Sequence, residues 1–92
     1  MSKNYTLITG ACGGLGKSFV KLCAHENSNL LLTGTSQKKL DALVLEFAEE
    51  FKSIEVKTFV CDLGIKENRI SLVDFIKQNN IVITRLINNA GV

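Results

Sequence analysis

Apolar residues in this chain gather in short runs that alternate with longer segments of mixed polarity. The short runs are nearly continuous, as in Leu30-Leu31-Leu32, and such runs predict strands that are covered on both faces. The predicted strands cover residues 4–9, 29–33, 54–60 and 82–88. In the longer segments apolar residues recur at helical spacing, which predicts helices at 14–27, 36–52 and 66–79. The pattern therefore predicts an α/β domain with a parallel sheet and helices on both faces.

The second and third predicted helices carry apolar positions that we expect to lie in the core. These positions are Leu40, Leu43, Val44, Phe47 and Phe51 in the second helix, and Ile70, Val73, Phe75 and Ile76 in the third. The last predicted strand is also rich in apolar residues. It would form an exposed apolar edge if the sheet ended there, and such edges invite aggregation.

A glycine-rich turn joins the first predicted strand to the first predicted helix. Its sequence is Thr9-Gly10-Ala11-Cys12-Gly13-Gly14-Leu15-Gly16. Glycines let the backbone turn tightly because they have no Cβ. The free N–H groups of the helix's first turn, together with the positive end of the helix dipole, then favour a bound anion. The segment predicts a β-α-β unit that binds the phosphates of a nucleotide.

Two nucleotide-binding patterns fit this turn incompletely. The dinucleotide pattern G-x-G-x-x-G is absent, and the chain has T-G-x-x-x-G-x-G in its place. Residues 11–18 fit the P-loop pattern G-x-x-x-x-G-K-[ST], except that Ala11 replaces the first glycine. In a P-loop, Lys17 would contact the β- and γ-phosphates and Ser18 would bind Mg²⁺. The motif alone leaves both interpretations open.

Two later segments favour a dinucleotide. The last predicted strand ends in Asn88-Asn89-Ala90-Gly91, and the third passes into Cys61-Asp62-Leu63. With the glycine-rich turn, these segments occur in the order and at the spacing found in the short-chain dehydrogenase/reductase family, which the chain resembles. Asp62 by itself fits a turn or helix N-cap before the third helix, so its role stays open.

The resemblance implies a Rossmann-type fold, and right-handed crossovers give the strand order 3-2-1-4 for its first β-α-β-α-β-α-β portion. It also implies a nicotinamide cofactor, with the Asp62 carboxylate accepting a hydrogen bond from the adenine amino group. The predicted cofactor-binding residues are Gly10, Cys12, Gly13, Gly14, Leu15, Gly16, Thr35, Ser36, Cys61, Asp62, Leu63, Asn89, Ala90 and Gly91. Thr9 is expected to support the loop.

Members of this family transfer hydride between the cofactor and a small carbonyl or alcohol substrate, using a Tyr-x-x-x-Lys pair. The only tyrosine here, Tyr5, is followed four residues later by Thr9, so we predict no catalytic residue in the chain. We expect residues 1–92 to be the amino-terminal part of a single dinucleotide-binding domain, inactive without the absent carboxy-terminal catalytic part. The full-length protein is expected to be a homo-oligomer. The alternatives are a P-loop hydrolase or kinase and a non-catalytic nucleotide-binding module.

The end of the second predicted strand indicates which nicotinamide cofactor is preferred. Sites for NAD(H) carry an acid there that bonds the ribose 2′-OH and would repel a 2′-phosphate. The chain has Gly34-Thr35-Ser36, followed by Lys38 and Lys39, and no acid. Hydroxyl groups and lysines suit a phosphate, so NADP(H) is favoured and NAD(H) is the alternative. Ser36 is also a suitable N-cap for the following helix.

Charge and cysteine content narrow the function classes further. The net charge is only +2 and the lysines are scattered, which argues against nucleic-acid binding. No apolar run has the length of a membrane span, so no membrane partner is predicted. Cys12, Cys23 and Cys61 lack metal-ligand spacing and indicate reduced thiols in the cytoplasm. Cys12 stands at a helix N-terminus, which predicts a lowered pKa.

Overall fold

Short apolar strands alternate with helices along residues 3–90, which are the residues that this structure, a computed structural model, describes. The strands are β1 (Lys3–Thr9), β2 (Asn29–Gly34), β3 (Val56–Val60) and β4 (Ile81–Asn88). The helices are α1 (Gly14–His25), α2 (Gln37–Glu46) and α3 (Lys66–Gln78). All neighbouring strands are parallel, in the order β3-β2-β1-β4. The predicted fold class and strand order are therefore confirmed.

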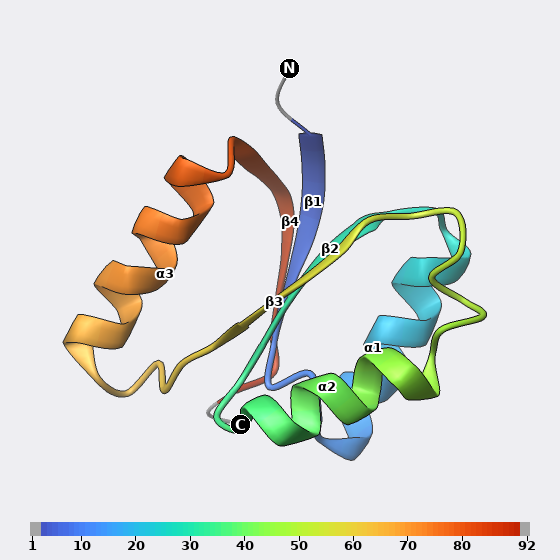
Figure 1. Cartoon of the computed structure of the whole chain (residues 1–92), viewed down its shortest axis with the longest axis horizontal. Coiled ribbons are helices and arrows are strands. Elements are labelled where there is room, and N and C mark those ends of the chain that lie inside the picture. The colour runs from blue at the N-terminus through green and yellow to red at the C-terminus, as the bar shows by residue number, and fades with distance from the viewer. Residues whose placement is uncertain (1–2, 91–92) are drawn as a thin grey trace.

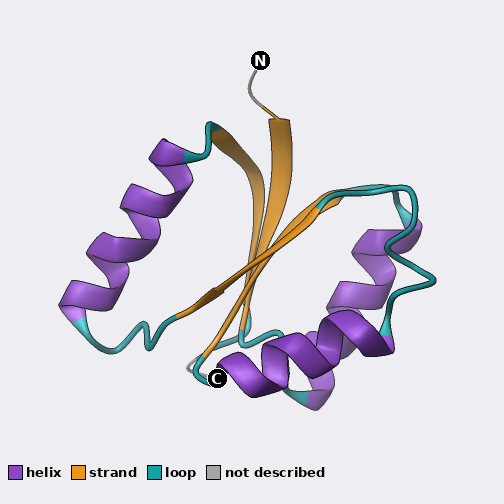
Figure 2. Cartoon of the chain, in the orientation of Figure 1, coloured by secondary structure: helices purple, strands orange, loops and turns teal. Residues whose placement is uncertain are grey.

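The helices lie on both faces of the sheet, with α1 and α2 on one face and α3 on the other (Figures 1 and 2). Strand β2 shows why, because its successive apolar side chains point to opposite faces. Leu30 and Leu32 belong to the cluster under α1 and α2, whereas Leu31 belongs to the cluster under α3. The sheet thus has an apolar core on each side. Within residues 3–90, no helix has the length and apolar character needed to cross a membrane.

The second helix is shorter than predicted, because α2 ends at Glu46 and the chain continues in turns to about residue 53. Three backbone N–H groups in this segment bond the carbonyl three residues earlier, which is tighter than an α-helix. Phe47 and Phe51 still pack against the core, with their rings edge to face at 6.1 Å. Apolar spacing alone does not distinguish these turns from a helix. The third strand accordingly begins at Val56, two residues later than predicted.

The prediction that Ile70 and Val73 lie in the core is wrong. Their side chains are 51% and 47% exposed, whereas Leu72 is buried against the sheet. Phe75 and Ile76 pack against the same cluster, as predicted. Helix α3 has neighbours on one side only, so the apolar residues on its flank face solvent.

Strand β4 contains a β-bulge. Tyr5 of β1 pairs with Ile83, but the next residue, Thr6, pairs with Arg85, which leaves Thr84 as an extra residue. Regular alternation would place Arg85 opposite Leu7, on the α3 face. The bulge instead turns the Arg85 side chain toward α1, as bulges re-aim side chains elsewhere.

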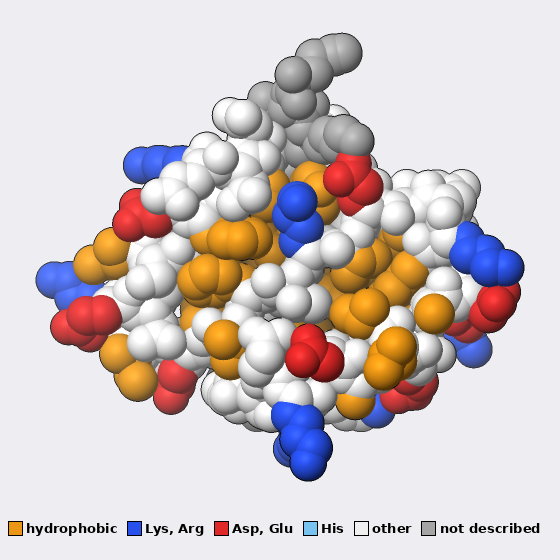
Figure 3. All heavy atoms as spheres, viewed as in Figure 1, with side chains coloured by type: hydrophobic (Ala, Val, Ile, Leu, Met, Phe, Trp, Pro, Cys, Tyr) orange, Lys and Arg blue, Asp and Glu red, His pale blue; other side chains and the backbone are white. Residues whose placement is uncertain are grey.

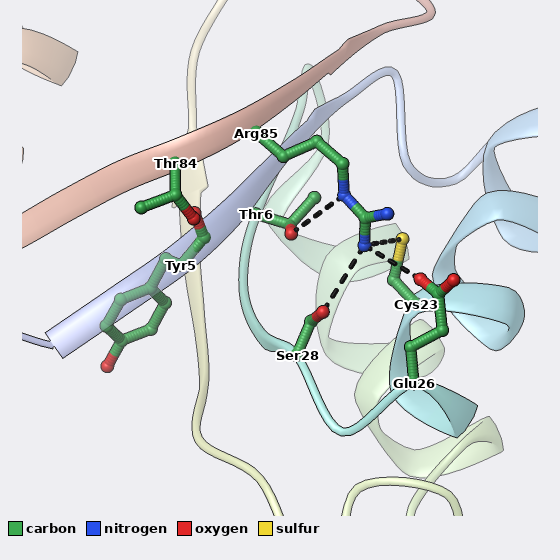
Figure 4. A network of polar contacts seen from close by, with 7 residues as sticks. All are labelled: Tyr5, Thr6, Cys23, Glu26, Ser28, Thr84 and Arg85. Atoms are coloured by element: carbon green, nitrogen blue, oxygen red, sulfur yellow. Dashed lines mark hydrogen bonds and ion pairs between the residues drawn. The ribbon is translucent and has the colours of Figure 1, made fainter.

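Arg85 joins β4 to the end of α1 (Figure 4). Its Nη2 atom donates to Glu26 Oε1 at 2.9 Å, to Ser28 Oγ at 3.3 Å and to Cys23 Sγ at 3.2 Å. Its Nε atom donates to Thr6 Oγ1 at 3.3 Å. The hydrogen bond to Glu26 raises the pKa of Arg85 further above its ordinary value, so the guanidinium stays charged.

Candidate nucleotide-binding site

A cavity of about 840 Å³ lies where the carboxyl ends of the strands meet the following loops. Open parallel sheets bind their ligands at this edge. The lining residues come from the ends of the strands and from the segments that follow them: Gly10, Cys12, Gly13, Thr33, Gly34, Thr35, Ser36, Lys39, Cys61, Asp62, Leu63, Gly64, Arg69, Asn88 and Ala90. A second, polar cavity of about 370 Å³ lies around Asn4 and Asn27 and contains none of the predicted site residues.

Most of the predicted site residues line the larger cavity. Those that do not are Gly14, Leu15, Gly16 and Asn89, and Gly91 lies outside the described residues. Four lining residues were not anticipated from the sequence: Thr33, Gly64, Arg69 and Asn88. Thr33, Gly64 and Asn88 each adjoin a predicted residue or segment, so their position in the sequence could have indicated them. Arg69 lies in the first turns of α3 and belongs to none of the motifs. Contact of any of these residues with a cofactor stays a prediction.

The glycine-rich turn packs closely because two of its glycines have no room for a side chain. Gly10 has a φ of +61°, which L-residues rarely adopt. A Cβ at this position would also lie 3.0 Å from the backbone nitrogen of Ala90. A Cβ at Gly16 would overlap the carbonyl oxygen of Gly10. Together these glycines bring the start of α1 against the end of β1.

The first turn of α1 is open to a ligand. A Cβ added to Gly14 would meet no atom within 4 Å, and the Leu15 side chain is exposed. The N-cap residue, Gly13, provides no side-chain cap, and the first turn contains no acidic residue. Its N–H groups therefore lack a competing side-chain acceptor, which is the arrangement that suits a bound phosphate.

Thr9 connects the glycine-rich turn to the end of β4. Its Oγ1 donates to Asn88 Oδ1 at 2.8 Å and accepts from the backbone N–H groups of Asn89 (2.9 Å) and Ala90 (3.1 Å). The Asn89 side chain donates to the Gly10 carbonyl at 3.1 Å. Because Thr9 is buried, these bonds fix the relative position of the two loops.

The loop after β3 is held by side-chain to backbone hydrogen bonds. Asp62 Oδ1 accepts from the Gly64 N–H at 2.9 Å, and the Asp62 N–H donates to Asn68 Oδ1 at 3.0 Å. The Arg69 Nη1 atom donates to the Leu63 carbonyl at 2.7 Å. Asp62 is therefore a turn residue, which was one of the two interpretations of its position. Its role as an acceptor for adenine stays a prediction.

The loop after β2 carries hydroxyl groups and a lysine. Ser36 Oγ accepts from the Lys39 N–H at 3.2 Å, which confirms Ser36 as the N-cap of α2. The Ser36 hydroxyl hydrogen remains available to a ligand. Thr35 is exposed beside it. Among the cavity-lining residues the only acid is Asp62, so the end of β2 offers donors and positive charge.

Cys12 lines the cavity with a thiol that resists ionisation. Burial raises the pKa of Cys12, and this effect exceeds the opposing attraction of Lys17 and Lys39. The sequence-based expectation of a lowered pKa is therefore wrong, because partial burial outweighs the attraction of the two lysines. Burial and the neighbouring Asp62 likewise raise the pKa of Cys61. Both thiols are neutral at pH 7.

The residues of the P-loop interpretation are engaged elsewhere. Lys17 Nζ forms an ion pair with Glu46 Oε1 at 3.0 Å, which joins α1 to α2. Ser18 Oγ donates to the Gly14 carbonyl at 3.3 Å, inside the helix. Neither residue lines the cavity. Across residues 3–90, no cluster of three or more His, Cys, Asp or Glu side chains is arranged to hold a metal ion. The P-loop interpretation is not supported.

Comparison with known proteins identifies the family. Residues 4–92 match the family model described as short chain dehydrogenase. The chain belongs to this family. The match includes all three motifs that suggested it, so the resemblance seen in the sequence is confirmed.

Two reductases and a dehydrogenase are among the proteins that this short-chain dehydrogenase chain resembles. It is 32% identical over 90 residues to the very-long-chain 3-oxoacyl-CoA reductase of Aspergillus niger, covering 96% of this chain and 25% of the relative. Among solved structures, menthone neomenthol reductase from Mentha piperita gives a TM-score of 0.80 at 29% identity, covering 100% of this chain and 33% of that one. A short-chain dehydrogenase from Sphingobium yanoikuyae in complex with NADPH gives 0.77 at 28% identity, covering 98% and 34%. The chain thus spans about a quarter of the length of the curated relative.

Proposed function

We propose that this chain binds NADP(H) for an oxidoreductase that transfers hydride between the cofactor and a carbonyl or alcohol substrate. The observation that carries the proposal is the cavity of about 840 Å³, which is lined by the glycine-rich turn, the loop after β2 and the loop after β3. Gly13, which lines the cavity, is the N-cap of α1 and provides no side-chain cap, so the first turn of this helix stays open to a phosphate. The family membership of the chain supports the same conclusion.

The residues present fit such a cofactor in three parts. The first turn of α1, from Gly14, would hold the pyrophosphate. Thr35, Ser36 and Lys39 would hold a 2′-phosphate, since hydroxyl donors and a cation stand where sites for NAD(H) carry an acid. Asp62 would accept from the adenine amino group. NADP(H) is therefore proposed over NAD(H), and the NADPH complex of the Sphingobium yanoikuyae relative supports this choice.

The cofactor supplies the hydride, whereas this chain supplies binding and orientation. Tyr5 is buried under α3, and its hydroxyl donates to Glu55 Oε1 at 3.4 Å, away from the cavity residues. A catalytic role for this tyrosine is therefore not proposed. The name of the Aspergillus niger relative makes a 3-oxoacyl-CoA the first substrate to test. The free cysteines favour a reducing compartment, and the proposed location is the cytoplasm. The homo-oligomer and the single dinucleotide-binding domain stay predictions.

A matched pair of variants tests the cofactor site. In the complete gene product, Gly14→Val places a side chain where the structure leaves open space, so the fold is expected to persist while the pyrophosphate is blocked. Calorimetric titration with NADPH should show at least about 100-fold weaker binding. Lys17→Ala should leave NADPH affinity unchanged, because the Lys17 ammonium is paired with Glu46 of α2. Heat from magnesium-ATP, with none from NADPH or NADH, would overturn the proposal.

A second substitution tests the preference for the 2′-phosphate. Thr35→Asp introduces a carboxylate that repels this phosphate and can bond a ribose hydroxyl. We expect NADPH affinity to fall about tenfold or more while NADH affinity rises. Thr35→Ser, which keeps the hydroxyl, is the control and should retain the NADPH preference. Equal losses for both cofactors in Thr35→Asp would contradict the assignment of this loop.

A further inference from the structure

Arg69 is the cavity-lining residue that neither the motifs nor the proposed function explains. It stands in the first turns of α3, and its side chain reaches the cavity beside the loop after β3. Its Nη1 atom donates to the Leu63 carbonyl at 2.7 Å. The Arg69 side chain is thus held at one nitrogen. This hydrogen bond lowers the loss of side-chain entropy when the rest of the guanidinium binds a ligand.

The guanidinium has no ionic partner in the described part of the chain. The ion pairs found among residues 3–90 involve Lys17, Lys52 and Arg85, not Arg69. Asp62 lines the same cavity, but its carboxylate forms no ion pair with Arg69 and instead accepts from Gly64. An Arg held by a backbone carbonyl at a cavity wall therefore keeps its planar face and its other N–H groups for a ligand.

Two neighbouring parts of the cavity differ in character. Thr35, Ser36 and Lys39 bring hydroxyl groups and a flexible ammonium after β2. After β3, which is the adjacent strand, the lining includes Arg69 and Asp62 together with Cys61 and Leu63, which belong to the apolar cluster under α3. A phosphate suits the first part, because it needs donors and charge. A flat aromatic ring suits the second, because Arg stacks on aromatic faces and Cys61 and Leu63 offer apolar contacts.

We propose that Arg69 is an adenine-binding residue of this site, and that its guanidinium plane stacks on the adenine ring of the bound cofactor. The inference rests on the proposed function, since it takes the ligand to be an adenine dinucleotide. It adds that the adenine is held by a cationic plane that α3 provides, in addition to any hydrogen bond from Asp62. Arg69 would thus contribute to the affinity for the adenosine half and not to the choice between NADP(H) and NAD(H).

Two nucleotide fragments separate these contributions. 5′-AMP carries the adenine and one 5′-phosphate, and 2′,5′-ADP carries the same groups together with a 2′-phosphate. In the complete gene product, Arg69→Ala should weaken both fragments by the same factor, about three- to tenfold. Lys39→Ala should weaken 2′,5′-ADP alone. Arg69→Lys should bind as weakly as Arg69→Ala, because it keeps the charge but loses the plane.

A neighbouring lysine provides a matched control. Lys66→Ala removes one positive charge from the same helix, outside the cavity lining. It should leave each fragment's affinity unchanged. Thermal unfolding of each variant should match the unaltered protein, since Arg69 is exposed.

Three results would overturn the inference while leaving the proposed function intact. These are unchanged affinities in Arg69→Ala, a loss confined to 2′,5′-ADP, and full recovery in Arg69→Lys, each with normal NADPH binding by the unaltered protein. Absence of NADPH binding by the unaltered protein would overturn the proposed function and this inference together.

Discussion

The two faces of the sheet differ in how completely helices cover them. Under α1 and α2, residues such as Ile8, Leu30 and Leu32 have no exposed surface. On the α3 face, Leu7 and Leu72 are buried, but Leu86 of β4 is 58% exposed. Figure 3 shows apolar side chains between α3 and β3 and between β3 and α2, where several core neighbours are only partly buried.

Simple geometry accounts for the difference. A helix is about 10 Å wide, and neighbouring strands are about 4.8 Å apart, so one helix covers about two strands. Two helices therefore suffice for a four-stranded sheet, and α3 alone leaves half of its face open. The glycine-rich turn therefore lies on the well-packed side, where α1 begins, whereas the loop with Asp62 leads into α3, which has fewer neighbours.

The largest expected effect comes from truncating matched leucines on the two sides. Leu32→Ala removes a fully buried side chain and should lower the free energy of unfolding by about 2–5 kcal/mol. Leu86→Ala should change it by no more than about 0.5 kcal/mol, because the side chain is already largely in water. Urea unfolding of the 92-residue chain measures both. Equal losses would contradict the difference between the faces.

A smaller effect is expected from adding a single methyl group at the start of α1. Gly16→Ala forces the new Cβ against the Gly10 carbonyl and should cost about 1–3 kcal/mol of stability. Gly14→Ala, two residues earlier, meets open space and should be neutral or stabilising by about 0.5 kcal/mol. Thermal unfolding of the two variants checks the contrast. A stable Gly16→Ala protein would show that the turn packs less tightly than its geometry indicates.

Cysteines on both faces predict a loss of stability at alkaline pH. Burial raises the pKa of Cys23 under α1 and of Cys61 under α3. Below the unfolded-state pKa of about 8.5, these thiols are protonated in both states and stability is unaffected. Above it the unfolded chain loses protons first, so stability should fall as pH rises. Unfolding measured from pH 7 to about 10 tests this, and Cys61→Ala should reduce the slope. A slope that is the same with and without Cys61 would refute the contribution of that thiol.

The smallest effect concerns Arg85, which connects β4 to α1. Arg85→Met keeps the aliphatic stem but removes the hydrogen bond to Glu26. Both side chains are nearly half exposed, so the loss should be no more than about 1 kcal/mol. The difference between the variant and the parent should shrink at high salt, because salt screens the pair. A loss of stability that does not depend on salt would show that the effect of Arg85→Met comes from packing of the aliphatic part of the side chain.

Much of the fold and part of the site could be predicted from the sequence. The strands followed from the apolar runs, and their order followed from the family resemblance and right-handed crossovers. Gly10 and Asp62 followed from motifs with fixed spacing. The end of α2 could not be predicted, because Phe47 and Phe51 keep helical spacing in a chain of turns. The exposure of the Ile70 side chain depends on how many helices cover the same face of the sheet as α3. The apolar pattern of a single helix does not predict that number.

The missed residues of the site have a similar explanation. Asn88 lines the cavity while Asn89 bonds the Gly10 carbonyl, and which of two adjacent asparagines faces inward depends on strand register. Arg69 enters the cavity because α3 begins where it does, after a loop whose length sets the helix phase. The positions of such residues depend on how helices and strands are placed relative to one another, and a short sequence motif does not contain this information.

The extra residue in β4 gives the sheet a tolerance to changes in chain length. Removing Thr84 would close the ladder while leaving each later pair, from Thr6 with Arg85 to Thr9 with Asn88, opposite the same partner. Evolution can therefore gain or lose one residue there without shifting the asparagines that border the cavity. Strand β4 thus has one position where a deletion would leave the register of its carboxyl end unchanged, whereas a deletion further along would displace the loop that follows.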